Sequence, residues 1–154
     1  MKAELQKKLF DKYPKIFVQK DLPMIQTCMC WGIDCGDGWY WLIDQLCGQL
    51  QWDIDKNGEL QLKASQVKEK FGSLRFYIDG GSIKQFSMIT LAETMSSSIC
   101  ELCGSTKNIG HTQGWIFTWC KECAEKDTGN RIWIEDKDEN KDEEKAKEIV
   151  TKIC

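Results

Sequence analysis

The chain has 154 residues, 42% of them hydrophobic and 29% charged, with a formal net charge of −3. This length allows one ordinary core plus a small lobe, and the acidic balance argues against a protein that mainly coats nucleic acid. Nine cysteines without an N-terminal secretory segment predict a reducing, cytoplasmic environment, and no apolar run reaches the roughly 20 residues of a membrane span.

Two helices are predicted in the first third of the chain. Apolar residues at helical spacing indicate the first helix over 2–12, ended by Pro14. A longer apolar stripe indicates the second over 37–49, with Asp37 as its N-cap. The members of this stripe are Trp39, Leu42, Ile43, Leu46, Cys47 and Leu50.

A short antiparallel sheet is predicted over 50–79. Asn57-Gly58 is typical of a type I′ hairpin turn, here between strands at 50–54 and 59–67. The same stretch begins like a calcium loop, but its twelfth position is Ala64, which lacks the required carboxylate. The hairpin is therefore the preferred interpretation.

The stretch that follows the first strands is predicted to complete the sheet and lead into a helix. A turn at 70–72 precedes a strand whose Leu74, Phe76 and Ile78 face the core. Ser82 and Gln85 form a capping box that opens a helix over 82–98. The core candidates of this helix are Phe86, Met88, Ile89, Ala92 and Met95.

Four residues on the outward face of the two predicted strands that flank the turn at 70–72 combine positive charge with an aromatic ring. They are Lys68, Lys70, Arg75 and Tyr77. Such a surface suits phosphate groups and nucleobases. The alternative is an exposed sheet face on which Arg75 pairs with Glu69 or Asp79.

A first group of cysteines surrounds the glycine-rich stretch before the second helix. Cys28, Cys30 and Cys35 have C-x-C-x4-C spacing, and Cys47 lies on the apolar face of the helix. This spacing matches no common zinc frame, so whether they bind a second metal stays open. The glycines at 32–38 lack the preceding strand that a phosphate-binding loop requires.

The strongest motif is a pair of C-x2-C elements. Cys100 and Cys103 form the first pair, Cys120 and Cys123 the second, and the interval between them fits a four-thiolate zinc site. Gly104 suits the tight backbone of a zinc knuckle. Because four thiolates close a tetrahedron, the motif predicts one structural Zn²⁺ with no open position for a substrate.

The residues between and after these pairs predict a small lobe around the metal. Residues 115–119 are interpreted as a strand that returns to the second pair, with a short helix after Cys123. Knuckle, hairpin and helix in this order are typical of a treble clef or a zinc ribbon. His111 is interpreted as a turn residue rather than a ligand.

The predicted fold class is therefore α+β: a short antiparallel sheet packed by helices, with a treble-clef-like or zinc-ribbon-like lobe. We divide the chain into an α+β body at 1–99, a zinc-binding lobe at 100–125 and an acidic linker with a C-terminal helix at 126–154. The acid-rich segment is 135–144, and the terminal Cys154 is expected to be exposed.

Three stretches together resemble a known protein family. GIDCGDGWYWLIDQLC, VKEKFGSLRFY and CELCG followed by GWIFTWCKEC occur in this order within roughly residues 20–125. They resemble small zinc-binding proteins encoded by phages and prophages, a family of unestablished activity. The resemblance implies the cytoplasm of a bacterial host cell, and it implies action by binding a host or defence protein. It transfers no catalytic residue.

Three classes of function remain open. The leading hypothesis is a zinc-stabilised protein-binding module without enzymatic activity, such as an anti-CRISPR-like inhibitor whose acidic 135–144 segment occupies the basic channel of a defence nuclease. The second is a nucleic-acid-binding accessory protein that uses the cationic and aromatic side chains of the predicted hairpin. The third is a carboxylate-metal enzyme using Asp34, Asp37 or Glu69. The oligomeric state is left open.

Overall fold

The computed structural model describes residues 1–136. Its helices are α1 (Ala3–Lys12), α2 (Tyr40–Asn57), α3 (Ile83–Ser96) and α4 (Lys121–Ala124), and its 3-10 segments are η1 (Val18–Asp21), η2 (Met29–Trp31) and η3 (Asp37–Trp39). Its strands are β1 (Ile33–Asp34), β2 (Lys63–Lys70), β3 (Ser73–Asp79), β4 (Ile109–Thr112), β5 (Thr118–Cys120) and β6 (Trp133–Glu135). This is the α+β class that the sequence predicts.

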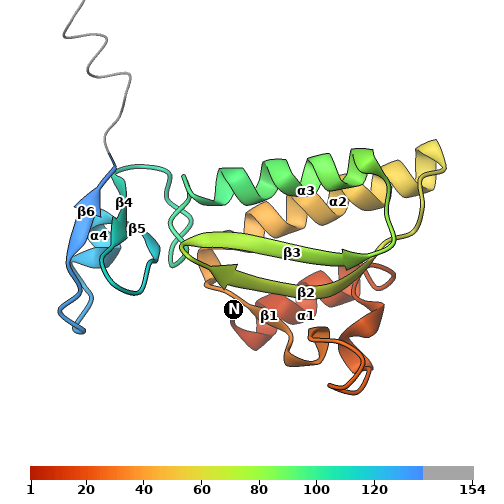
Figure 1. The fold of residues 1–154 in the computed structure, drawn as a ribbon, viewed down its shortest axis with the longest axis horizontal. Coiled ribbons are helices and arrows are strands. Elements are labelled where there is room, and N and C mark those ends of the chain that lie inside the picture. The colour runs from red at the N-terminus through yellow and green to blue at the C-terminus, as the bar shows by residue number, and fades with distance from the viewer. Residues whose placement is uncertain (137–154) are drawn as a thin grey trace, which may run out of the picture.

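The body is built around a three-stranded sheet in the order β1-β2-β3. β2 and β3 are antiparallel and are joined by a two-residue turn, in which Phe71 and Gly72 both have positive φ. β1 pairs in parallel with β2 through the register Ile33 to Val67. Figure 1 shows α2 and α3 beside β3, and α1 beyond β2. The sheet thus carries its hairpin turn at one end, facing the smaller lobe.

One apolar core joins the helices to the sheet. Alternating residues of the hairpin enter it from one face, among them Val67, Leu74 and Phe76. α1 contributes Leu9, and the fully buried Trp39 anchors the start of α2. Burying a large aromatic side chain such as Trp39 stabilises the fold by a few kcal/mol, about 25 cal/mol for each Å² of apolar surface.

The predicted hairpin at Asn57-Gly58 is wrong. α2 continues to Asn57, and Gly58 is its left-handed C-cap with φ 71° and ψ 22°. The strand predicted at 50–54 is the last part of this helix, and β2 begins only at Lys63. The physical reason is that a glycine with positive φ ends a helix as readily as it forms a type I′ turn.

The calcium-loop reading of this stretch is also excluded by the helix. Asp53 is a buried helical residue whose carboxylate accepts hydrogen bonds from Lys84 and Asn57. The Asp53–Lys84 ion pair connects α2 to the start of α3. These contacts hold the pKa of Asp53 below its usual value, through the Lys84 bond first and the Asn57 bond second.

Other local predictions are confirmed or corrected by the model. α1 spans nearly the predicted range, and Ser82 and Gln85 form the reciprocal capping box of α3. Of the core candidates in α3, Ile89 and Ala92 are buried, whereas Phe86 and Met95 are exposed. Asp37 does not cap α2, because it lies in η3 and accepts a hydrogen bond from the Lys2 amide.

The smaller lobe contains the second sheet, in the order β5-β4-β6. Its own small core includes Trp119, against which Trp133 of β6 packs. The strand expected over 115–119 is shorter than predicted, because only Thr118–Cys120 pairs with β4. β6 was not predicted, and it extends the lobe's sheet past residue 125.

Two further sequence predictions fall outside what can be described. Most of the acid-rich segment 135–144 and the whole C-terminal helix lie beyond residue 136, as does Cys154. Among the described residues, no helix is both long enough and apolar enough to cross a membrane.

Candidate functional site

The four cysteines of the two C-x2-C pairs converge on one point. The sulfur atoms of Cys100, Cys103, Cys120 and Cys123 all lie within 4.8 Å of one another. The Sγ atoms of Cys103 and Cys120 are 3.6 Å apart. A tetrahedral site with metal–sulfur bonds of about 2.3 Å places its sulfurs about 3.8 Å apart. The cluster is therefore able to hold a metal ion, and its chemistry is consistent with zinc.

Local backbone structure positions each cysteine pair. Around the first pair, the Gly104 amide donates to the Cys100 carbonyl (2.8 Å), and the Cys100 amide donates to the Ser105 carbonyl (2.7 Å). Gly104 has φ 76°, a conformation that L side chains rarely adopt. The second pair spans the end of β5 and the single turn of α4, which begins at Lys121 and so contains Cys123 rather than following it. This is the knuckle, hairpin and helix order that the sequence predicts.

The thiols of the cluster differ in acidity. Burial raises the pKa of Cys120 to about 11. At Cys103 burial also acts to raise the pKa, but the Ser105 amide and the neighbouring thiols outweigh it and lower the pKa. A divalent cation supplies the positive charge that four converging thiolates need, so metal binding releases protons.

The remaining histidine and cysteines do not join this cluster. His111 lies in β4, rather than in a turn, and its Nδ1 is 2.7 Å from Oδ1 of Asp136. Within residues 1–136, the four cysteines are the only group of three or more cysteine, histidine or carboxylate ligand atoms close enough to hold a metal. A second site built on Cys28, Cys30, Cys35 and Cys47 is thus not formed.

The glycine cluster before α2 forms the surface on which the knuckle docks. The Gly38 amide donates to the Glu101 carbonyl (2.7 Å), and the Gly36 amide donates to Oε1 of Glu101 (2.8 Å). Trp39 Nε1 donates to the Ile99 carbonyl (2.9 Å). A Cβ on Gly38 would lie 2.2 Å from the Cys100 carbonyl oxygen. The glycines therefore permit backbone contact between the two lobes.

Glu101 is the polar centre of this contact. Its side chain is 6% exposed, and burial raises the pKa of its carboxyl group, with the Gly36 hydrogen bond acting in the opposite direction. The sequence analysis did not single out this residue. Glu101 directly follows Cys100 inside a C-x2-C pair, and the motif itself carries no signal for the burial of the residues within it.

A second contact joins the lobes at the tip of the β2–β3 hairpin. Thr118 of β5 donates its hydroxyl hydrogen bond to the Gly72 carbonyl. The Gly72 amide donates to Oε1 of Glu69 (2.7 Å). A Cβ on Gly72 would lie 2.9 Å from the Ile116 side chain. The hairpin tip is thus held against the metal-binding lobe.

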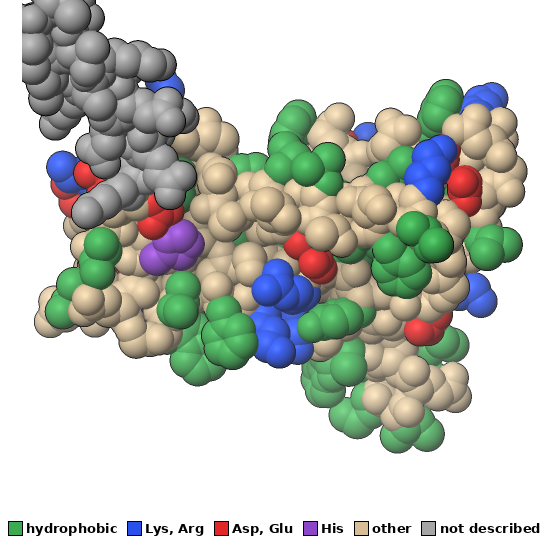
Figure 2. Space-filling model, turned by 45° about the horizontal axis from the view of Figure 1, so that its top comes forward, with side chains coloured by type: hydrophobic (Ala, Val, Ile, Leu, Met, Phe, Trp, Pro, Cys, Tyr) green, Lys and Arg blue, Asp and Glu red, His purple; other side chains and the backbone are tan. Residues whose placement is uncertain are grey.

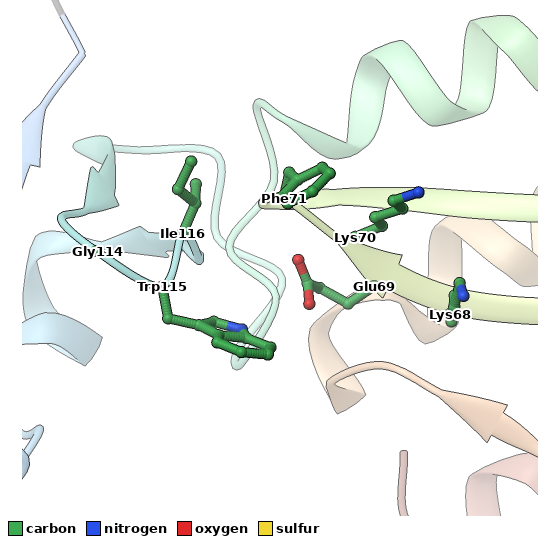
Figure 3. A pocket seen from close by; sticks show the side chains of 7 residues that line it. All are labelled: Lys68, Glu69, Lys70, Phe71, Gly114, Trp115 and Ile116. Carbon is green, nitrogen blue, oxygen red and sulfur yellow. The ribbon is translucent and has the colours of Figure 1, made fainter.

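Beside this contact the two lobes enclose a pocket of about 270 Å³, which we call the junction cleft. Figure 3 shows the hairpin side chains on one side of the cleft and Trp115 and Ile116 on the other. Both tips are aromatic and exposed: Phe71 is 71% exposed and Trp115 is 74% exposed. The lining residues are Lys68, Glu69, Lys70, Phe71, Gly114, Trp115 and Ile116.

The four predicted nucleic-acid-binding residues share one face of the hairpin. Lys68 lies opposite Arg75 in the register, and its ammonium group is 5.9 Å from the centre of the Tyr77 ring. Lys68 and Lys70 also line the junction cleft. Figure 2 shows Lys and Arg side chains gathered in the middle of one face, with hydrophobic side chains on both sides. Within residues 1–136, Arg75 forms no ion pair with Glu69 or Asp79, the alternative that the sequence left open.

Sequence reasoning missed the aromatic part of the cleft. The turn predicted at 70–72 and the strand predicted at 115–119 do not connect Phe71 or Trp115 with the lysines. A large apolar residue placed within a predicted turn, as Phe71 is, is the one weak sequence signal of an exposed aromatic side chain. The approach of Trp115 to the hairpin depends on lobe docking, which no short motif encodes.

The carboxylates of the enzyme hypothesis are not brought together. Asp37 is tied to Lys2 by a backbone hydrogen bond and an ion pair of 3.0 Å. Glu69 accepts the Gly72 amide at the hairpin tip. In the described part of the chain neither residue forms a carboxylate cluster with Asp34.

Comparisons with protein families, curated proteins and solved structures found no match for this chain. The resemblance to phage-encoded proteins therefore stays a prediction from the sequence motifs. Function has to be argued from the residues themselves.

Proposed function

We propose that this protein is a zinc-stabilised binding module without catalytic activity, and that its target is another protein. The observation that carries the proposal is a pair of exposed tryptophans on α2. Trp41 is 61% exposed and Trp52 is 52% exposed. They are eleven residues apart, about three helical turns, so they lie on the same side of the helix.

The residues between these tryptophans continue the same exposed stripe. Gln45 and Gln49 are exposed at helical spacing, and neither carries a charge. The opposite side of α2 is buried in the core. Tryptophan is the residue type most enriched among those that dominate binding energy at protein interfaces. A rigid helix that presents two tryptophans and two neutral polar groups suits a protein partner.

The metal centre supports a binding role rather than a catalytic one. We propose that the ion is Zn²⁺, because four thiolates with tetrahedral spacing favour it. A site closed by four protein ligands leaves no coordination position for a substrate. Its contribution is to stabilise the small lobe, whose own apolar core is too small to hold the fold without the metal.

For the target we propose a nucleic-acid-processing enzyme of bacterial defence, such as a CRISPR nuclease. The support is the composition of the acid-rich segment 135–144, which complements a basic nucleic-acid channel, together with the phage-type motifs. In this proposal α2 provides the apolar anchor, and the acidic segment provides charge complementarity.

The test is co-purification from a bacterial lysate followed by native mass spectrometry. The wild-type chain is expected to retain a partner protein, and a Trp41→Ala/Trp52→Ala double variant to lose it while keeping its zinc and melting temperature. Trp115→Ala is the matched control, since it removes an exposed tryptophan from the other lobe. Equal recovery of the partner with the double variant would refute α2 as the binding face.

The acidic segment is tested separately. A chain ending at residue 136 keeps the Asp136 contact with His111 and removes most of the acidic residues. If the partner is a nuclease, inhibition of cleavage is expected to weaken sharply with this truncation and with rising salt. Full inhibition by the truncated chain would exclude the acidic segment as a determinant.

A further inference from the structure

The junction cleft combines two kinds of side chain that single-stranded nucleic acids require. We infer that the cleft is a binding site for single-stranded nucleic acid, in which a base stacks on Trp115 and the flanking phosphates contact Lys68, Lys70 and Arg75. This activity goes beyond the proposed protein target, and it uses neither of the α2 tryptophans.

The positive charges of the hairpin face are available to a ligand. Within the described chain, Lys68, Lys70 and Arg75 form no ion pair with a carboxylate. The Arg75 guanidinium donates to the Ser73 hydroxyl (2.9 Å) and to the Leu74 carbonyl (2.8 Å), so it turns toward the hairpin tip. Three cations thus gather along the end of the hairpin that borders the cleft.

One oxygen of the carboxylate that lines the cleft is engaged by the hairpin turn. Oε1 of Glu69 accepts the hydrogen bond of the Gly72 amide within the turn. Lys68 and Lys70 flank Glu69 in sequence and, by strand alternation, lie on the opposite face of β2. Glu69 also lines the cleft (Figure 3), so the phosphates are expected to approach from the face of the hairpin that carries Lys68, Lys70 and Arg75.

The aromatic side chains provide the stacking surface. Trp115 and Phe71 stand on opposite sides of the cleft, each about three quarters exposed. Base stacking on an aromatic side chain is tolerant of sequence and contributes about 1–3 kcal/mol per base. The cleft volume is near the lower end of ligand pockets, about 300 Å³. It therefore suits one unstacked nucleotide, which a duplex does not offer.

The structure favours nucleic acid over an acidic peptide for this cleft. Carboxylates would satisfy the three cations, but they would leave Trp115 and Phe71 without stacking partners. A nucleotide satisfies both sets of side chains, because its base stacks on the aromatic rings while its phosphates contact the cations. The test distinguishes these occupants, since an acidic peptide gives salt-dependent binding that is insensitive to the aromatic residues.

The experiment is fluorescence anisotropy with a labelled oligo-dT 12-mer and the full-length, zinc-loaded protein over 50–200 mM salt. Affinity is expected to fall with salt with a log–log slope of about −2, as three phosphate contacts on a single strand predict. Trp115→Ala should weaken binding by about tenfold or more at an unchanged slope, whereas Trp115→Phe should retain most of the affinity. Lys68→Gln/Lys70→Gln should reduce the slope.

The controls separate this site from a general effect of charge. Lys63→Gln removes an exposed lysine from the start of β2, away from the hairpin tip, and should leave affinity and slope unchanged. A duplex of the same length should bind more weakly than the single strand. Absence of binding at 50 mM salt, equal loss with Lys63→Gln, or indifference to Trp115→Ala would each overturn the inference. None of these results bears on partner capture by α2, so the two proposals fail independently.

Discussion

The docking of the metal-binding knuckle on the glycine cluster predicts a large effect for Gly38→Ala. The added Cβ would lie 2.2 Å from the Cys100 carbonyl oxygen and 2.4 Å from the Gly104 amide nitrogen. Both neighbours are backbone atoms, so neither is able to rotate away. The substitution therefore forces the knuckle and the start of α2 apart.

The magnitude follows from the contacts that this separation breaks. Overpacking a tight contact costs about 1–3 kcal/mol. Separation also weakens the Gly38–Glu101 and Trp39–Ile99 hydrogen bonds, each worth about 1 kcal/mol. We expect a loss of about 3–5 kcal/mol in the free energy of unfolding. For a domain of this size that lowers the melting temperature by roughly 10 °C.

The assay is urea unfolding at a fixed free zinc concentration, followed by tryptophan fluorescence, with zinc release measured in parallel. Gly58→Ala is the control, because Gly58 has φ 71° but no atom within 4 Å of the added Cβ. That variant should lose only about 1–2 kcal/mol through backbone strain. A Gly38→Ala protein within about 1 kcal/mol of wild type would show that the lobes do not dock in this way.

Further expectations concern the metal centre, the free thiols and the buried ion pair. Cys120→Ser should abolish stoichiometric zinc in native mass spectrometry and lower the melting temperature by roughly 10 °C or more, because metal binding is coupled to folding of the lobe. Cys28→Ser is the control and should change neither quantity. If Cys28→Ser removes zinc, the ligand assignment is wrong. With native zinc-loaded protein at pH 8, iodoacetamide should modify the exposed Cys28 but leave Cys35 unmodified until the chain unfolds. The reason is that burial raises the pKa of the Cys35 thiol to about 12. Equal labelling rates of the two cysteines by peptide mass spectrometry would contradict the burial of Cys35. Asp53→Asn should lower the melting temperature at pH 7, and the difference from wild type should shrink as the pH falls below about 4. The reason is that folding lowers the pKa of Asp53, so its carboxylate stabilises the fold above the pKa of the unfolded chain and loses this effect when it is protonated. A difference that does not change with pH would contradict this ion-pair role.

Features set by neighbouring residues were predictable from the sequence. The C-x2-C spacing predicted that four sulfur atoms converge on one point, because each pair is a local turn with few alternative geometries. The turn at 70–72 and the capping box of Ser82 were predictable for the same reason. Within each C-x2-C pair, within the turn and within the capping box, the interaction partners are within about four residues of each other, so the local pattern contains the structural constraint.

Features that depend on distant contacts were not predictable in this way. Asn57-Gly58 fits a hairpin and a helix end equally well by local criteria, and the choice depends on Asp53, which Lys84 of another helix holds in the core. The glycines at 36 and 38 resembled a weak loop motif. Glycine is needed at these two positions because the backbone of residues 100–104, more than sixty positions along the chain, approaches too closely for any side chain.

The same long-range docking connects the metal to the candidate binding surface. The four cysteines are not among the residues that line the cleft. Cys120 ends β5, and Thr118 of the same strand holds the tip of the β2–β3 turn. Trp115 and the lysines of β2 line the same cleft (Figure 3), and the Thr118–Gly72 hydrogen bond holds the two sides of that cleft together. Loss of the metal should therefore separate Trp115 from the cations, and weaken an aromatic and cationic site without touching one of its residues. In the proposed arrangement, a metal held by the four cysteines would therefore act on binding only by positioning Trp115.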